Sequence, residues 1–388
     1  MRSVVVLGGG IVGLAMAREL RGRGVDVELL ESRRIGTGAT AASTGILTPP
    51  QHTRTPFYQL RTLAWKTWPQ FADDLATETG IDVGYRRCGG IDIRERTMRN
   101  PQREVNKLRD SGGKVEILTG ARISQLLPEM VRTPEAGLLV EMEARIDPLA
   151  TIEALRQSCL ASGVRIREGL GPIRIEPQGT AGIHLAGPQE LQLEQPSEHR
   201  MVVLAAGWES ATAVLAVPPS PLPLEPVPGE AIALDIEAPP HLVHFNVALS
   251  GFRDASGNRS IYSWIPAPDG SSWLGNSVAS GHRNGADGVP PQEAVEPTRE
   301  GHQELVEVAL SMFGPGVENR ITDHRAGIRP KATRHGGPLL GMWPGRPQLW
   351  VATGHYRAGL LVGPASATML ADAMLDGAVI PEEFCLPG

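Results

Sequence analysis

Three glycines near the N-terminus have the spacing that a backbone needs in order to hold a phosphate. Gly8, Gly10 and Gly13 form the pattern G-x-G-x-x-G directly after the apolar run 3–7. In such a pattern the first glycine allows a tight turn, the second lets the backbone approach a pyrophosphate, and the third lets helix and strand pack closely. A helix that begins here would offer its free N–H groups and its positive dipole end to the phosphates.

A carboxylate completes this pattern. Glu31 ends the second apolar run, 25–30, and stands 18 residues after Gly13. There it can accept hydrogen bonds from both hydroxyls of a ribose. A lone glycine triplet would be weak evidence, but strand, glycine turn, helix, second strand and terminal acid together predict a dinucleotide site. The alternative is a βαβ unit that binds nothing.

The segment after Glu31 favours FAD over a nicotinamide nucleotide. Residues 33–47 are rich in Gly, Ala, Ser and Thr and carry almost no bulk until Ile46. A nicotinamide enzyme usually moves directly into its next βαβ unit. A loop of small residues instead suits backbone laid along an extended ribityl-pyrophosphate chain, and the alternative is a flexible surface loop.

Length and composition predict a soluble enzyme with more than one domain. The chain has 388 residues, of which 41% are hydrophobic and 21% charged, ordinary values for a globular protein. Its net charge of −6, without a basic cluster, argues against nucleic acid and anionic membrane surfaces as partners. Cys88, Cys159 and Cys385 are widely separated, so neither a disulfide framework nor a metal-ligand spacing is visible.

Neither end of the chain predicts a membrane segment. The N-terminus has no signal-peptide layout, and Pro364 and Asp372 interrupt the apolar stretch 360–375. We therefore expect a cytoplasmic protein without a membrane span. His241 and His244 form H-x-x-H on a strand-like segment, where helical metal spacing does not apply, so we expect no metal site.

Along the rest of the chain, Rossmann-like elements are interrupted by other elements and then resume. We predict helices over 55–80, 97–111 and 147–161, the last capped by Asp147. We predict strands at 89–93, 163–167 and 201–208.

The second half of the chain reads as a linker, a strand-rich region and a loop. Prolines in 217–229 exclude helix and central strand, so we expect a stiff extended crossover there. Residues 230–280 are strand-like with a turn at 268–270, and 281–300 are expected to form an exposed polar loop.

Five motifs give the chain a family resemblance over most of its length. They add to the N-terminal glycine pattern and are Thr44–Leu47, Val203–Gly207, Pro228–Glu230, Ala326–Pro330 and Gly354–Leu361. With them the chain resembles a glycine oxidase of the D-amino-acid oxidase-like FAD superfamily, which includes the thiamine-pathway glycine oxidases and the glycine-oxidising subunits of cyanide synthases. The last two motifs are the most specific.

The resemblance implies a fold of the α/β and α+β classes. A Rossmann-like FAD-binding domain would be discontinuous, and a mostly antiparallel-sheet substrate domain would be inserted into it. The implied FAD-binding segments are 1–84, 145–212 and 321–388, and the implied substrate-binding segments are 85–144 and 213–320.

The resemblance also implies which residues hold FAD. Residues 320–365 contain no cysteine, so we expect the FAD to be bound noncovalently. The implied cofactor residues are Gly8, Gly10, Ile11, Val12, Gly13, Glu31, Ser32, Ala39, Thr40, Thr44, Gly45, Ile46, Ile173, His355, Tyr356, Arg357, Ala358, Gly359, Leu360 and Leu361.

The implied reaction is oxidative deamination of glycine or another small amino acid, such as sarcosine or a small D-amino acid. Hydride passes from Cα to flavin N5, and the 2-oxo acid, ammonia and hydrogen peroxide result. By resemblance Arg329 binds the substrate carboxylate, Tyr262 assists it, and Arg357 lies beside substrate and flavin. No side chain is expected to act as acid or base. A surface or interdomain arginine and a core tyrosine are the structural alternatives.

Departures from the family pattern leave the substrate open. Ala267 follows Pro266 where arginine is usual, Ile46 replaces a common methionine, and Ala358 replaces asparagine. A larger amine that carries a carboxylate therefore remains a candidate substrate. Two other functions also remain open: a dehydrogenase that passes electrons to a quinone or partner subunit, and a catalytically silent flavoprotein. The expected partners are an amino-acid substrate and oxygen, and a homo-oligomer is compatible with the sequence.

Overall fold

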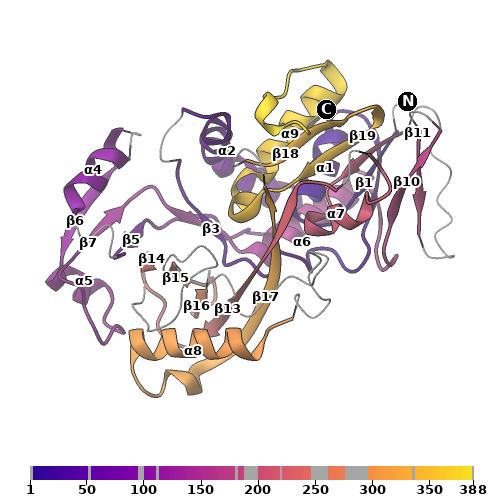
Figure 1. The fold of residues 1–388 in the computed structure, drawn as a ribbon. Coiled ribbons are helices and arrows are strands. Elements are labelled where there is room, and N and C mark those ends of the chain that lie inside the picture. The colour runs from indigo at the N-terminus through magenta and orange to yellow at the C-terminus, as the bar shows by residue number, and fades with distance from the viewer. Residues whose placement is uncertain are drawn as a thin grey trace.

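The computed structural model describes residues 3–50, 54–94, 100–110, 113–179, 182–187, 200–218, 221–245, 261–275, 296–333 and 337–386. Within them the chain forms two large sheets (Figure 1). One carries the N-terminal glycine pattern, and the other is built mainly from the middle of the chain.

The six-stranded sheet has the order β18 (Leu339–Trp343), β19 (Arg346–Thr353), β12 (Arg200–Leu204), β1 (Ser3–Leu7), β2 (Asp26–Leu30), β9 (Arg165–Arg167). Its strands pair in parallel except for the β18–β19 pair, which is antiparallel. Parallel strands are buried on both faces, which explains the unbroken apolar run of β1. Val4 and Val6 pack toward the large helices, whereas Val5 and Leu7 belong to a second core cluster on the other face.

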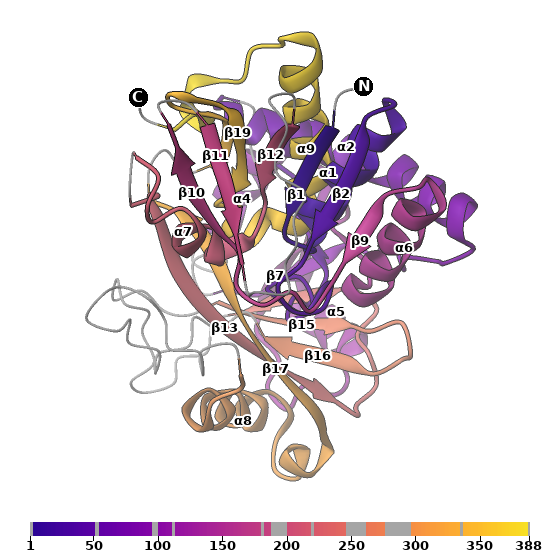
Figure 2. The same ribbon diagram turned by 90° about the vertical axis from the view of Figure 1, so that its right-hand side faces the viewer.

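Four helices build the core beneath this sheet. They are α1 (Ile11–Gly22), α2 (Pro56–Thr79), α6 (Pro148–Ala161) and α9 (Gly359–Asp376). Helices α1 and α2 each contact both α6 and α9, and α1 also contacts β1. Over the opposite face lie the hairpin of β10 (Arg174–Gln178) and β11 (Gly182–Ala186) and the short helix α7 (Ser210–Ala213) (Figure 2).

The eight-stranded sheet has the order β17 (Ile321–Ala332), β13 (Leu224–Leu234), β16 (Ser272–Gly275), β15 (Tyr262–Pro266), β14 (Leu242–Phe245), β5 (Gly90–Asp92), β7 (Ala136–Val140), β6 (Val115–Thr119). All neighbours pair antiparallel except β14 and β5. Helix α8 (Arg299–Phe313) covers one face, where Leu305 and Val308 pack with Trp264 and Leu274. Figure 2 shows the long strands β13 and β17 running from the six-stranded sheet toward α8.

Smaller elements complete the described chain. The three-stranded sheet of β3 (Ile46–Leu47), β8 (Ala144–Arg145) and β4 (Arg86–Arg87) lies where the chain passes between the two large sheets. Helices α4 (Pro101–Asp110) and α5 (Gly120–Leu126) pack against β6 and β7. Single turns of 3-10 helix occupy Gly207–Glu209, Val317–Arg320, Tyr356–Ala358 and Glu382–Phe384.

The structure confirms the fold class and most of the predicted elements. The helix predicted at 147–161 is α6, and the Asp147 carboxylate accepts hydrogen bonds from the N–H groups of Leu149 and Ala150 at 2.8 and 3.1 Å. This cap satisfies N–H groups that have no partner within the helix. The turn predicted at 268–270 joins β15 to β16.

The linker predicted at 217–229 is wrong in its second half. Strand β13 begins at Leu224 and includes Pro226 and Pro228, which pair in register with Pro330 and Ile328 of β17. On the other side β13 pairs with β16 only from Ala231 onward. The prolines therefore occupy a strand region with one described neighbour, where a missing N–H is tolerated.

Two other boundaries differ from expectation. Strand β17 was expected in the FAD-binding segment 321–388, but it pairs in the eight-stranded sheet. The loop expected over 281–300 lies outside the described residues as far as 295, and α8 has already begun at Arg299. The division into two domains remains our proposal, with the last boundary moved to the end of β17.

Within the described residues one helix, Tyr356–Asp376, is long and apolar enough to cross a membrane, and 56% of its most apolar window is buried inside the protein. We expected Pro364 to break this stretch, but α9 continues through it. Helix α9 packs on α1 and α2, and this packing compensates for the one hydrogen bond that Pro364 cannot donate.

Gly13 is the glycine on which the start of α1 depends most. A Cβ added there would lie 1.9 Å from the carbonyl oxygen of Gly8, a backbone atom that cannot move away cheaply. We expect Gly13→Ala to lower the free energy of unfolding by about 1–3 kcal/mol or to prevent folding.

Gly22, at the other end of α1, is the matched control. A Cβ there meets nothing within 4 Å, so Gly22→Ala should stabilise the helix by up to about 1 kcal/mol. Thermal unfolding of both variants measures the difference, and equal midpoints would contradict this account of Gly13.

Candidate active site

A single large cavity of about 1020 Å³ joins the two sheets. Its lining comes from the N-terminal glycine turn, the small-residue loop after Glu31, the segment 352–361, and the inner ends of strands in the eight-stranded sheet. The described part of the chain thus places most of the predicted site residues around one space.

The glycine turn opens one end of this cavity for phosphates. Gly8 has φ +109, and a Cβ there would lie 2.5 Å from the carbonyl oxygen of Ala205. Gly10 is the N-cap of α1 and supplies no side-chain cap, so the helix start faces the cavity as bare backbone. The side chain of Thr40 lies across this turn, with its Oγ1 accepting from the Ile11 N–H at 3.3 Å. Backbone N–H groups at a helix start suit a pyrophosphate.

Backbone hydrogen bonds orient the carboxylate of Glu31 beside the glycine turn. Its Oε2 accepts from the Gly9 N–H at 2.7 Å, and its Oε1 accepts from the Arg33 N–H at 2.8 Å. An ionised carboxylate has about four acceptor sites. The Ser32 hydroxyl donates to Oε1 as well, at 3.2 Å. The two bonds to backbone orient Glu31, and rotation of the Ser32 hydroxyl would free a second site for the hydroxyls of a ribose.

The small-residue loop lines the middle of the cavity. Every predicted cofactor residue lies in the cavity wall except Gly13 and Gly45. Gly45 has φ +82, and a Cβ there would lie 2.1 Å from the carbonyl oxygen of Ile146. Gly13 and Gly45 are thus required by close backbone approach, and they position the wall without forming it.

The turn at 354–361 forms the opposite wall. Tyr356 has φ 51, the one positive φ outside glycine among the described residues. This sparsely populated conformation brings the backbone of 355–358 to the cavity before α9 begins. Trp68 of α2 anchors the turn, because its indole N–H donates to the carbonyl of Leu361 at 2.8 Å.

His355 in this turn is uncharged at neutral pH. Burial lowers the pKa of its imidazole to about 4, and its Nε2 lies 3.2 Å from the Ser366 hydroxyl. His355 therefore contributes shape and a hydrogen bond to the wall without adding a charge.

Arg329 brings a half-buried positive charge to the cavity. Burial, followed by the neighbouring charge of Arg357, lowers the pKa of Arg329 to about 10. The guanidinium still carries its charge at neutral pH. Its Nη1 donates to the carbonyl of Pro228 at 3.2 Å, and its plane lies on Gly229 of β13. A planar, positioned guanidinium suits a carboxylate.

Tyr262 does not lie where the resemblance implied. Its ring is 1% exposed and belongs to the core under α8, and its hydroxyl donates to Glu304 Oε1 at 2.5 Å. Its strand neighbours Ile261 and Ser263 line the cavity instead. Side chains alternate across a strand, so the structural alternative of a core tyrosine is the correct one.

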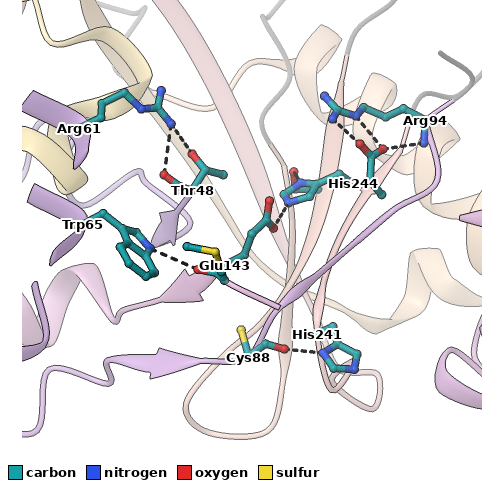
Figure 3. A network of polar contacts seen from close by, with 11 residues as sticks. Thr48, Arg61, Trp65, Cys88, Arg94, Glu143, His241 and His244 are labelled. Carbon is teal, nitrogen blue, oxygen red and sulfur yellow. Dashed lines mark hydrogen bonds and ion pairs between the residues drawn. The ribbon is translucent and has the colours of Figure 1, made fainter. Parts of the chain in front are cut away.

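A polar network that sequence reasoning missed lies at the sheet end of the cavity (Figure 3). His244 lies between two partners, with Nε2 2.7 Å from Glu143 Oε2 and Nδ1 2.8 Å from Ser263 Oγ. His241 contacts the carbonyl of Cys88 instead. The two histidines point to different partners, and the described residues contain no group of three metal-ligand side chains.

This fold and this cavity define a dinucleotide-binding enzyme of the flavoprotein type. The family model described as FAD dependent oxidoreductase, DAO, matches residues 3–373, and the chain belongs to this family. Its cofactor is FAD. The bare glycine turn, the oriented Glu31 and the wall of small residues fit that dinucleotide.

Known proteins resemble the chain over nearly its whole length. A glycine oxidase of Pseudomonas aeruginosa is 27% identical over 391 residues, which cover 96% of this chain and 94% of the relative. The bifunctional protein ThiO/ThiG of a Nostoc species is 26% identical over 391 residues and 97% of this chain; the match covers 53% of that protein, so the chain spans about half its length. The solved structure of glycine oxidase from Geobacillus kaustophilus has a TM-score of 0.81 at 22% identity, with 100% of this chain and 99% of that chain covered.

Gly229 gives a test of how Arg329 is held. A Cβ at Gly229 would lie 2.1 Å from Arg329 Nη1, the far end of a flexible side chain. We expect Gly229→Ala to move the guanidinium while the fold survives. Both Gly229→Ala and Arg329→Ala should then lose about 2–5 kcal/mol of affinity for a carboxylate such as benzoate.

Benzoate titration followed by flavin absorbance measures this loss. Arg325→Ala is the matched control, because Arg325 lies on the same strand, stacks over Trp273 and pairs with Asp323. If Gly229→Ala bound benzoate as tightly as the wild type, the contact with Gly229 would not position Arg329.

Proposed function

We propose that this enzyme is an amino-acid oxidase that uses oxygen and water to convert glycine, sarcosine or a small D-amino acid to the 2-oxo acid and hydrogen peroxide, with release of ammonia, or of methylamine from sarcosine. The observation that carries the proposal is the position of Arg329. It is a half-buried guanidinium in the wall of the cavity, close to Arg357 of the turn at 354–361. The names of the glycine oxidase relatives support it.

The protein would contribute binding and orientation. FAD, when bound, supplies the hydride acceptor. Arg329 would hold the substrate carboxylate through paired hydrogen bonds, which fixes the direction of Cα. Arg357, also in the wall, would add a second positive charge near the carboxylate. With its nitrogen neutral, the substrate needs no side chain to remove a proton from it.

A dehydrogenase of the same fold is the second candidate. It would oxidise the same substrates but pass electrons to a quinone or to a partner subunit. Either enzyme would fit a reducing compartment, since the three cysteines are free thiols.

Anaerobic mixing with a panel of glycine, sarcosine, D-alanine and L-alanine tests the reaction. We expect the first three to bleach the flavin and, in air, to give hydrogen peroxide. Bleaching by L-alanine alone would refute the substrate assignment. Bleaching without peroxide in air would favour the dehydrogenase.

We also propose that the FAD is bound noncovalently. None of the three cysteines lines the cavity, and Cys159 is fully buried against α1, where burial raises the pKa of its thiol to about 12. Acid precipitation of the purified yellow protein should release FAD into the supernatant. Flavin that stays with the precipitated protein would show a covalent bond.

A further inference from the structure

The end of the cavity formed by the eight-stranded sheet carries a second set of polar and charged side chains. We name this set the distal cluster, and its members are Asp92, Arg94, Glu143, His244 and Ser263. All five line the cavity, away from the glycine turn. Figure 3 shows Glu143 pointing toward His244, with Arg94 beyond it.

Strand pairing brings the distal cluster together. His244 on β14 pairs in register with Asp92 on β5 and with Ser263 on β15. Residues paired in register share a face of the sheet. Their sequence neighbours Ile91, Val243 and Tyr262 belong to the apolar core on the other face.

Glu143 is fixed within this cluster from two sides. His244 holds Oε2 at 2.7 Å, and Ser263 in turn holds the other ring nitrogen of His244 at 2.8 Å. The carboxylate also lies against Gly90, where a Cβ would be 1.8 Å from Oε2. The Glu143 side chain therefore has one orientation, and His244 acts as its positioning residue.

Glu143 keeps an open acceptor. The residue is 8% exposed, and within the described residues its Oε1 accepts no hydrogen bond. An ionised carboxylate oxygen that accepts no hydrogen bond from the protein can accept one from water or from a bound molecule. Because Glu143 lines the cavity, a donor on a bound molecule can satisfy Oε1.

The charge balance of this end favours a cation. Asp92 and Arg94 form a two-point ion pair, so their charges cancel locally. Glu104 of α4 also lines the cavity here. Arg61 lines the cavity as well and lies by Thr48 in Figure 3. Three carboxylates thus face two guanidinium groups and one imidazole, which leaves one net negative charge when His244 is neutral. Arg329 and Arg357 also line the cavity and bring positive charge to it.

We propose that Glu143 determines substrate specificity by binding a second cationic group, an ammonium or guanidinium, at the end of the substrate away from its carboxylate. This rests on the proposed function, because it assumes that the carboxylate lies on Arg329. The favoured substrates are amino acids that carry a positively charged side chain. Complementary charge at both ends of the cavity would select and orient them.

Binding of ω-amino acids tests the proposal without any reaction. 5-Aminopentanoate and 6-aminohexanoate carry a carboxylate and a distal ammonium but no amine at Cα, and pentanoate and hexanoate are their matched controls. Flavin absorbance titration of the holoenzyme gives each dissociation constant. We expect at least one amino compound to bind about tenfold tighter than its control.

Glu143→Gln should bring this ratio close to one, because the amide keeps the shape and loses the charge. Glu141→Gln is the matched control and should keep the ratio, since the Glu141 side chain is 52% exposed and pairs with Lys114. Equal affinity of amino and plain acids in the wild type would overturn the proposal, even if Glu143→Gln failed to fold. An unchanged ratio in Glu143→Gln would overturn it as well.

Kinetics separate this proposal from the proposed function. We expect D-lysine or D-ornithine to reduce the flavin with a higher kcat/KM than D-alanine, and Glu143→Gln to remove that preference mainly through KM. If no amino acid reduced the flavin, the oxidase assignment would fail, while the binding ratio would still decide the role of Glu143. If D-alanine were preferred over both basic substrates, the specificity role would fail and the oxidase assignment would stand.

Discussion

The part of the cavity built by β13 and β17 depends on one positive charge, Arg329, that is partly removed from water. A guanidinium removed from water is unfavourable unless hydrogen bonds and an anion surround it. Arg329 is held in the cavity wall by the carbonyl of Pro228 and by the flat surface of Gly229. The long pairing of β13 with β17 brings these residues together from positions 101 apart in sequence. The same two strands link the substrate side of the cavity to the cofactor side.

Side chains alternate along the strands of the eight-stranded sheet, so one face forms the apolar core and the other lines the cavity. One face of β14 and β15 gives Val243, Tyr262 and Trp264 to the core under α8. The other face gives His244 and Ser263 to the cavity. Because each strand contributes to both, a shift of one residue in register would exchange the apolar and polar sets. The packing of α8 therefore also fixes which side chains line the cavity.

The cavity wall around the glycine turn and the turn at 354–361 differs from the wall built by the eight-stranded sheet, because backbone groups form much of its surface. Gly8, Gly10 and the strained turn at Tyr356 bring main-chain groups to the cavity from the two ends of the chain. Side chains such as Trp68 anchor these turns from behind. A wall of backbone and small residues accommodates a long dinucleotide, whereas the substrate end relies on charged side chains with fixed orientation.

The sequence alone was enough to predict the part of the cavity around the glycine turn, because the patterns that indicate it are local in the chain. The glycine spacing, Glu31, the small-residue loop and the cap at Asp147 each depend on residues close together in the chain, and the structure places them as predicted. Strand β13 with its prolines, the continuation of α9 through Pro364 and the burial of Tyr262 were decided by tertiary packing. So was the pairing of Glu143 with His244, 101 residues apart. Local pattern shows that a strand alternates, but the partner strands and the covering helix decide which face becomes core and which becomes cavity.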